Sequence, residues 1–167
     1  GSIRLWGSLG WIGCVLLALG RPEEALSCFA RALAANPDHA EAANNRADAL
    51  RQLGRLDQAL EACEQALAIQ PDLAAAHGNR GTVLAQMRRW GEAIAAFDAA
   101  LAGSPADAGL HCNRGNALLA VNRLDEAMAS FRRAIGIDPG FDDARAALGE
   151  ASLRARRHQD AADAFAL

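Results

Sequence analysis

Small and apolar positions recur along this chain at the spacing of amphipathic α-helices. Ala47 is followed three positions later by Leu50, and Gly81 and Gly115 are followed in the same way by Leu84 and Leu118. Residues three or four positions apart lie on one face of a helix, which can then pack against a neighbour. The pattern predicts an all-α protein built from short amphipathic helices.

The pattern repeats every 34 residues. Alanine recurs at this interval, at Ala25, Ala59, Ala93, Ala127 and Ala161. Four positions later come Phe29, Cys63, Phe97, Phe131 and Phe165. A proline ends each of the first four periods, at Pro37, Pro71, Pro105 and Pro139. Such a fixed period indicates a helical repeat protein, in which stacked units bury one continuous core.

Each period contains the start and stop signals of two helices. The first helix is expected to end at Gly20, Gly54 or Asn122, residues that accept a left-handed conformation. Arg88 and Arg156 stand at the matching places of the other two periods and fit less well. The second helix begins with acidic residues, which suit a helix N-terminus, and proline stops it. The small residues of paired helices allow close approach, and the phenylalanines fill the remaining space.

These residues resemble the signature of the tetratricopeptide repeat family. The resemblance covers nearly the whole chain as one domain, with four complete repeats at 6–39, 40–73, 74–107 and 108–141 and a partial fifth at 142–167. It implies a solenoid of antiparallel helix pairs that forms a right-handed superhelix with a concave groove. The Gly-Ser pair at 1–2, which stands without a methionine, is typical of a cloning scar.

Asparagine occupies the sixth position of three consecutive repeats, as Asn45, Asn79 and Asn113. It is a poor residue for a helix interior, whereas its amide can donate to and accept from a peptide backbone. The row resembles the asparagines in the repeats of O-linked N-acetylglucosamine transferase, which hold extended polypeptides by their main chain. That resemblance implies a peptide groove, to which we add the neighbouring residues Asn44, Asp48, Arg51, Thr82, Gln86 and Asn116. Alternatively, the amides are solvated or pair with one another between repeats.

Three arginines, Arg46, Arg80 and Arg114, stand where the family usually has leucine. A buried guanidinium requires a carboxylate or carbonyl partner. We therefore expect these side chains to pack between helices and to bridge to an acidic residue of an adjoining helix or loop.

Catalytic, metal and cofactor sites find little support. The four cysteines are far apart and form no CxxC pair, and no glycine-rich phosphate loop is present. His77 and His111 share one repeat position and are expected to fill an aromatic packing slot. We expect no enzyme activity, no cofactor and no metal.

Charge and composition limit the classes of partner that the chain is expected to bind. The formal net charge is −3 and the basic residues are scattered, so neither nucleic acid nor a membrane surface is expected as a partner. All 17 basic residues are arginine, which excludes a lysine-based clamp for a peptide C-terminus and suggests a GC-rich, bacterial coding sequence. Unpaired cysteines favour reduced thiols in the cytoplasm.

The first repeat is unusually apolar. The stretch from Leu5 to Gly20 carries no charge, but it is broken by glycine, fits the repeat frame and is shorter than the roughly 20 residues of a membrane span. We read it as a repeat helix with an exposed apolar patch, and such patches mark interfaces. We therefore expect a homo-oligomer through residues of this helix, namely Trp6, Trp11, Cys14 and Leu17.

The sequence predicts a non-enzymatic protein-interaction module that binds an extended polypeptide in its groove. Two alternatives remain open. The first is a self-assembly module that acts through the apolar first repeat, and the second is the substrate-recruiting arm of a larger enzyme such as a glycosyltransferase.

Overall fold

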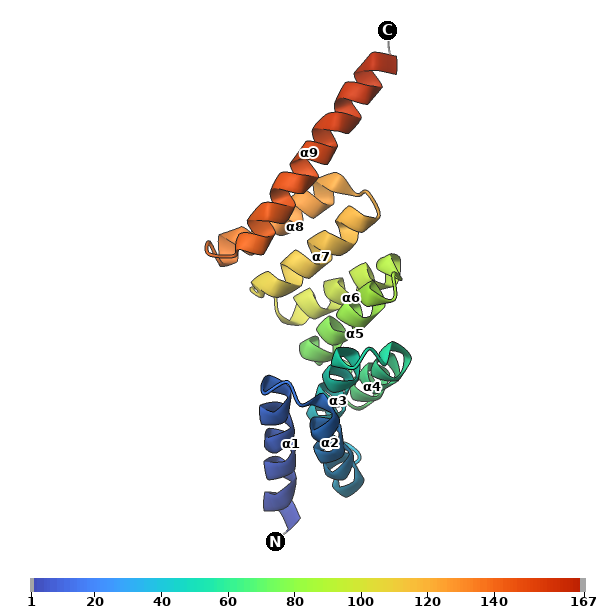
Figure 1. Ribbon diagram of the computed structural model, residues 1–167, viewed down its shortest axis with the longest axis vertical. Coiled ribbons are helices and arrows are strands. Elements are labelled where there is room, and N and C mark those ends of the chain that lie inside the picture. The colour runs from blue at the N-terminus through green and yellow to red at the C-terminus, as the bar shows by residue number, and fades with distance from the viewer. Residues whose placement is uncertain (1, 166–167) are drawn as a thin grey trace. The chain divides into compact units, whose positions relative to one another are not determined.

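The computed structural model describes the backbone of residues 2–165 and the side chains of residues 9–156. All regular elements in this part are α-helices, which confirms the predicted class (Figure 1). The helices are α1 (Ser2–Ala18), α2 (Pro22–Ala35), α3 (Ala40–Gln52), α4 (Leu56–Ile69), α5 (Ala74–Gln86), α6 (Trp90–Gly103), α7 (Ala108–Ala120), α8 (Leu124–Ile137) and α9 (Asp142–Phe165).

The turns between paired helices contain a residue in the left-handed conformation. Gly20 and Gly54 have φ angles of +69° and +72°, and Asn122 has a φ of +61°. Arg88 adopts the same conformation, with a φ of +60°, although it has a side chain that disfavours it. The repeat geometry therefore prevails over the preference of this residue, at a cost of roughly 1–2 kcal/mol.

An arginine immediately precedes the second helix of each of the first four repeats and bonds to a side chain three positions later. The guanidinium of Arg21 donates to Glu24 at 2.6 and 2.7 Å, and that of Arg123 donates to Glu126 at 2.7 and 2.6 Å. These hydrogen bonds hold the pKa of both carboxyl groups below the usual value. The predicted acidic first turns are thus present.

The chain forms two compact units, residues 1–88 and residues 89–167. In the first unit, α1 packs against α2, α3 against α4, and α5 against both α3 and α4. Phe29 is fully buried beneath Gly13 of α1, and a Cβ built on that glycine would lie only 2.5 Å from the ring. Most of the other buried residues of this core are alanines, which let the helices approach closely, as expected.

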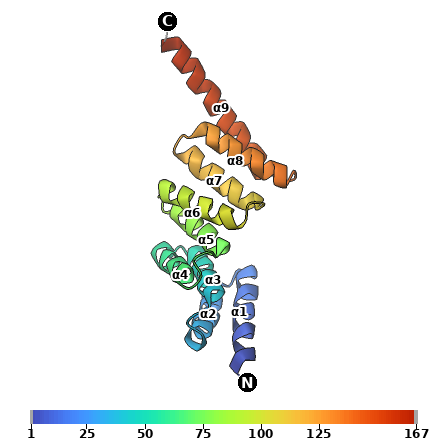
Figure 2. The same cartoon turned by 180° about the vertical axis from the view of Figure 1, so that it is seen from behind.

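The second unit contains α6 to α9, which follow one another side by side (Figures 1 and 2). Phe131 of α8 is fully buried and faces Gly115 of α7, where an added Cβ would approach its ring to 2.5 Å. The pairing of small residue and phenylalanine expected from the sequence is confirmed here.

The fifth repeat differs from the expected helix pair. The backbone continues as the single 24-residue helix α9 through Arg156, where the repeat frame places a turn. Arginine is a good helix former and a costly residue in the left-handed turn conformation. The preference of arginine agrees with this continuation, although Arg88 takes the left-handed conformation at the equivalent position.

The uncharged first segment folds as a repeat helix. Its residues form α1, which lies against α2 and contributes to the core of the first unit. Among the helices that the structure describes, none combines the length and the apolar character needed to cross a membrane.

Candidate functional site

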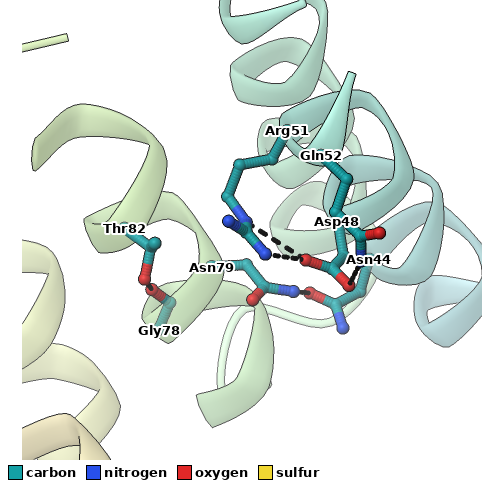
Figure 3. A network of polar contacts seen from close by, with 7 residues as sticks. All are labelled: Asn44, Asp48, Arg51, Gln52, Gly78, Asn79 and Thr82. Atoms are coloured by element: carbon teal, nitrogen blue, oxygen red, sulfur yellow. Dashed lines mark hydrogen bonds and ion pairs between the residues drawn. The ribbon is translucent and has the colours of Figure 1, made fainter. Parts of the chain in front are cut away.

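Polar side chains of α3 and α5 meet in the first unit at the repeat positions singled out in the sequence. The Nδ2 of Asn79 donates a hydrogen bond of 2.9 Å to the Oδ1 of Asn44, on the preceding repeat (Figure 3). Asn44 is 7% exposed and is one of the few buried polar residues among those described. The partner of Asn79 is therefore the fifth residue of the repeat, whereas the sequence suggested the sixth, Asn45.

Asp48 accepts hydrogen bonds from two side chains beside the Asn79–Asn44 pair. Its Oδ1 accepts from the Nε and Nη2 of Arg51 at 3.1 and 2.6 Å, and its Oδ2 accepts from the Nε2 of Gln52 at 3.0 Å. Arg51 and Asp48 are both about three-quarters covered. The carboxylate holds two flexible side chains in place on the surface of α3, close to the amide pair (Figure 3).

The remaining predicted residues of this unit lie apart from the amide pair. Asn45 donates to the Sγ of Cys14 at 3.2 Å, which ties α3 to α1. The hydroxyl of Thr82 bonds to the carbonyl oxygen of Gly78 in its own helix at 3.0 Å. Gln86 is exposed near the end of α5.

In the second unit, the predicted residues Asn113 and Asn116 are both exposed on α7. The Nδ2 of Asn116 lies 3.9 Å from the Sγ of Cys112, one helical turn earlier. Asn113 makes no side-chain hydrogen bond with any residue whose side chain is described. Their amides therefore remain available to solvent or to a ligand.

The amide pair of the first unit keeps two unused groups. One hydrogen bond joins Asn79 and Asn44, which leaves the Oδ1 of Asn79 as an acceptor and the Nδ2 of Asn44 as a donor. Neither makes a further hydrogen bond within the described part of the chain. The pair thus presents one acceptor and one donor, fixed relative to each other by their mutual bond.

The expectation for the three arginines is confirmed at one of them. Arg114 donates from Nε to Asp98 of α6 at 2.6 Å and from Nη1 to the hydroxyl of Ser130 on α8 at 2.7 Å. Arg46 and Arg80 make no ion pair with any described residue, which differs from what we expected. Relative to Arg46, the position equivalent to Asp98 is Ala30, which has no carboxylate. Relative to Arg80 it is Glu64, which nevertheless forms no ion pair with Arg80.

The two recurring histidines have a structural role. The Nε2 of His77 lies 2.8 Å from the carbonyl oxygen of Pro71, and that of His111 lies 3.0 Å from the carbonyl oxygen of Pro105. Since a carbonyl only accepts, both rings donate and tie each first helix to the loop before it. The 34-residue spacing shared by these histidines and prolines was a signal for this contact.

Three of the four thiols are shifted towards the protonated form by burial, which makes them weaker nucleophiles and metal ligands. Burial raises the pKa of Cys63 to about 12, although the positive charge of Arg80 partly opposes the shift. Burial also raises the pKa of Cys14 and of Cys112. The described residues contain no cluster of side chains that could hold a metal ion.

An apolar patch lies on α1, but with different members from those expected. Trp11, which is 68% exposed, lies on α1 with the exposed residues Ile12 and Val15, and Leu19, which is 64% exposed, lies in the turn that follows this helix. Leu17 is half-buried against the core, so the expectation that it is exposed is wrong. Cys14 is exposed, and the side chain of Trp6 lies outside the described residues.

Comparison with known proteins supports the repeat assignment. The tetratricopeptide repeat pattern matches residues 12–74 and 79–141, and a second pattern of the same description matches residues 118–167. The chain belongs to the tetratricopeptide repeat family. As a member of this family it is a scaffold of the protein-interaction class, and such scaffolds are generally non-enzymatic. No curated protein matches its sequence.

Solved structures share the fold of this tetratricopeptide repeat chain. MamA from Desulfovibrio magneticus RS-1 is 25% identical, with a TM-score of 0.81 over 97% of this chain and 92% of that one. PilF from Pseudomonas aeruginosa is 20% identical, with a TM-score of 0.87 over 98% of this chain and 74% of that one. YrrB, described as having an unusual peptide-binding site, is 22% identical, with a TM-score of 0.73 over 89% and 76%.

Proposed function

We propose that the surface formed by α3 and α5 binds an extended polypeptide through its main chain. The observation that carries this proposal is the Asn79–Asn44 hydrogen bond, which leaves one amide acceptor and one amide donor free. In an extended chain, the N–H and C=O of one residue point to the same side, as they do in an antiparallel sheet. That N–H donates to Asn79 Oδ1, and the C=O accepts from Asn44 Nδ2.

The surrounding residues supply further contacts. Asp48 and Arg51 hold each other beside the amide pair and form a polar border for the peptide. In the second unit, Asn113 and Asn116 are proposed separately as peptide contacts because their amides are exposed on α7. Each hydrogen bond contributes about 0.5–1.5 kcal/mol, so useful affinity requires several of them. The assignment accords with YrrB, whose description names a peptide-binding site.

The test is a binding measurement on peptides selected from a displayed random library against the whole chain. We expect Asn79→Ala and Asn44→Ala each to weaken binding of a selected peptide about 3- to 10-fold, because each removes a main-chain hydrogen bond. Alanine substitutions along the peptide should change the dissociation constant little, whereas N-methylation of the peptide nitrogen that donates to Asn79 should weaken binding at least as much as Asn79→Ala does.

The matched control is Gln65→Ala, which alters an exposed polar residue of α4, away from the amide pair. Its affinity should equal that of the wild type. An unchanged dissociation constant for Asn79→Ala, with its fold verified by circular dichroism, would refute main-chain binding at this surface.

A second candidate function is self-assembly through α1. The observation that favours it is the group of exposed apolar side chains on this helix and in the turn after it, with Trp11 and Leu19 the most exposed. Contiguous apolar surface of this kind is typical of an interface. We propose that a second copy of the chain covers it.

Light scattering across micromolar concentrations tests this candidate. The wild type should show a mass that increases with concentration, and the Trp11→Glu, Leu19→Glu double variant should remain a monomer because charge opposes burial. Leu153→Glu, which alters a 60% exposed leucine on α9, is the control and should behave as the wild type. A monomeric wild type at all concentrations would exclude self-assembly.

A further inference from the structure

Arg46 lies in an open concavity of the first unit, on the side of α3 turned away from the amide pair. It is two positions from both Asn44 and Asp48, and two residues correspond to about 200° around a helix. The concavity, of about 370 Å³, lies between α2 and α4 and is lined by Leu26, Ser27, Ala30, Arg46, Leu50, Arg55, Gln58 and Glu61.

Arg114, the equivalent arginine of the fourth repeat, has two hydrogen-bond partners that Arg46 lacks. Arg114 is held by Asp98 on the preceding repeat and by Ser130 on its own repeat. Counting back two periods of 34 residues, these partners correspond to Ala30 and Ala62. Neither alanine can accept a hydrogen bond through its side chain, so Arg46 retains a half-buried guanidinium without a partner among the described residues.

The charged residues that line the concavity indicate the charge of the ligand that it can bind. The lining contains two cations, Arg46 and Arg55, and one anion, Glu61, so its net charge is +1. Arg55 already donates from its Nε to the Oε1 of Gln58 at 2.5 Å. A singly charged carboxylate therefore matches this site, whereas a phosphate dianion would leave excess negative charge beside Glu61. Leu26 and Leu50 provide apolar surface for the carbon chain that carries the carboxylate.

We propose that this concavity binds the carboxylate of an acidic peptide side chain. This carboxylate pairs with Arg46 in the way that Asp98 pairs with Arg114. Ala30, which is exposed on the rim, leaves room for that group. The planar guanidinium pairs with a carboxylate through parallel hydrogen bonds. The site is independent of main-chain binding at α3 and α5.

The experiment follows the Nε–Hε resonances of the arginines by NMR while short peptides are added to the whole chain. We expect acetyl-Gly-Glu-Gly-amide to shift the Arg46 resonance with a dissociation constant on the order of 1 mM, as a single charged contact allows. The neutral acetyl-Gly-Gln-Gly-amide should cause no shift. Acetyl-Gly-Gly-Gly with a free C-terminus distinguishes a terminal carboxylate from a side-chain carboxylate. The Arg114 resonance should not move, because its guanidinium is already paired.

Ala30→Asp is the decisive variant because residue 30 is the repeat position equivalent to Asp98, so the variant gives Arg46 a carboxylate from the chain itself. We expect this variant to lose binding of the glutamate peptide, and Ala30→Asn, which has the same shape without the charge, to retain it. Glu61→Gln should bind more tightly, since it removes the competing negative charge. Asn79→Ala should bind as the wild type, which separates this site from the proposed main-chain site.

Two results would overturn the proposal. The first is an equal response of Arg46 to the glutamate and glutamine peptides. The second is unchanged glutamate-peptide binding in Ala30→Asp, with its fold verified by circular dichroism.

Discussion

At two glycine positions of this chain, the space around the Cα atom determines whether a larger side chain fits. Gly115 faces the ring of Phe131, and an added Cβ would lie 2.5 Å from it, which is inside the contact distance of two carbon atoms. Gly136, on the following helix, is exposed and has no neighbour within 4 Å of such an atom. The two glycines have the same chemistry and differ only in their surroundings.

We predict opposite effects of alanine at these two sites. Gly115→Ala should lower the free energy of unfolding by about 1–3 kcal/mol because the ring must move. Gly136→Ala should raise it by about 0.5–1 kcal/mol because alanine restricts the unfolded chain. Urea unfolding followed by circular dichroism measures both, and equal effects would contradict the close contact between Gly115 and Phe131.

At this scale the sequence indicated which residues face the neighbouring helices, but it did not identify their partners. The asparagines stood out because they recur in register, and Asn79 does lie in a polar network. Its partner is Asn44 because the contact between α3 and α5 depends on how the two helices are offset and rotated. One-dimensional spacing does not contain that offset.

At the scale of the elements, Arg114 links three consecutive helices. It lies on α7 and bonds to Asp98 on α6 and Ser130 on α8. Its side chain is 23% exposed and that of Asp98 is 52% exposed, so solvent partly screens the pair. The bridge therefore aligns the helices and adds a modest stabilisation.

A double-mutant cycle with Arg114→Ala and Asp98→Ala measures this bridge. We expect a coupling free energy of about 0.5–1 kcal/mol from urea unfolding of the four proteins. The comparison pair is Arg145 and Asp142, which are more exposed and lie on one helix, so their coupling should be below about 0.5 kcal/mol. A coupling of zero for Arg114 and Asp98 would show that the bridge does not contribute.

The helix boundaries follow from local chemistry with one exception. Glycine and asparagine mark the turns, and Arg88 adopts the same left-handed conformation although it is neither. Arg156 stands at the equivalent position, yet α9 continues through it. The same residue type therefore gives a turn in one repeat and a helix in another, depending on its neighbours in space.

At the scale of the whole molecule, stability depends on pH through the arginine–glutamate pairs at the helix starts. The pKa values of Glu24 and Glu126 are lowered in the folded chain, first of all by the hydrogen bonds from Arg21 and Arg123. A lowered pKa means that the pair stabilises the fold above the usual carboxyl pKa, and that this stabilisation is lost as the pH falls through the lowered value.

We predict that the Glu24→Gln, Glu126→Gln double variant melts at a lower temperature than the wild type at pH 7. The difference should shrink as the pH falls below the usual carboxyl pKa and the wild-type carboxylates become protonated. Glu23→Gln is the control because Glu23 forms no ion pair with a described residue. Parallel melting curves at all pH values would contradict a role for the two pairs.

The fold class, the repeat frame and most turns of this chain could be derived from residue order, because they depend on helical periodicity and on local backbone preferences. The partner of Asn79 could not be derived in this way, nor could it be derived which of Arg46, Arg80 and Arg114 has one. Whether Asn79 meets Asn44 or Asn45, and whether an arginine finds a carboxylate, depends on the rotation and offset of packed helices. Those quantities come from the contacts of many side chains together, and only the folded arrangement contains them.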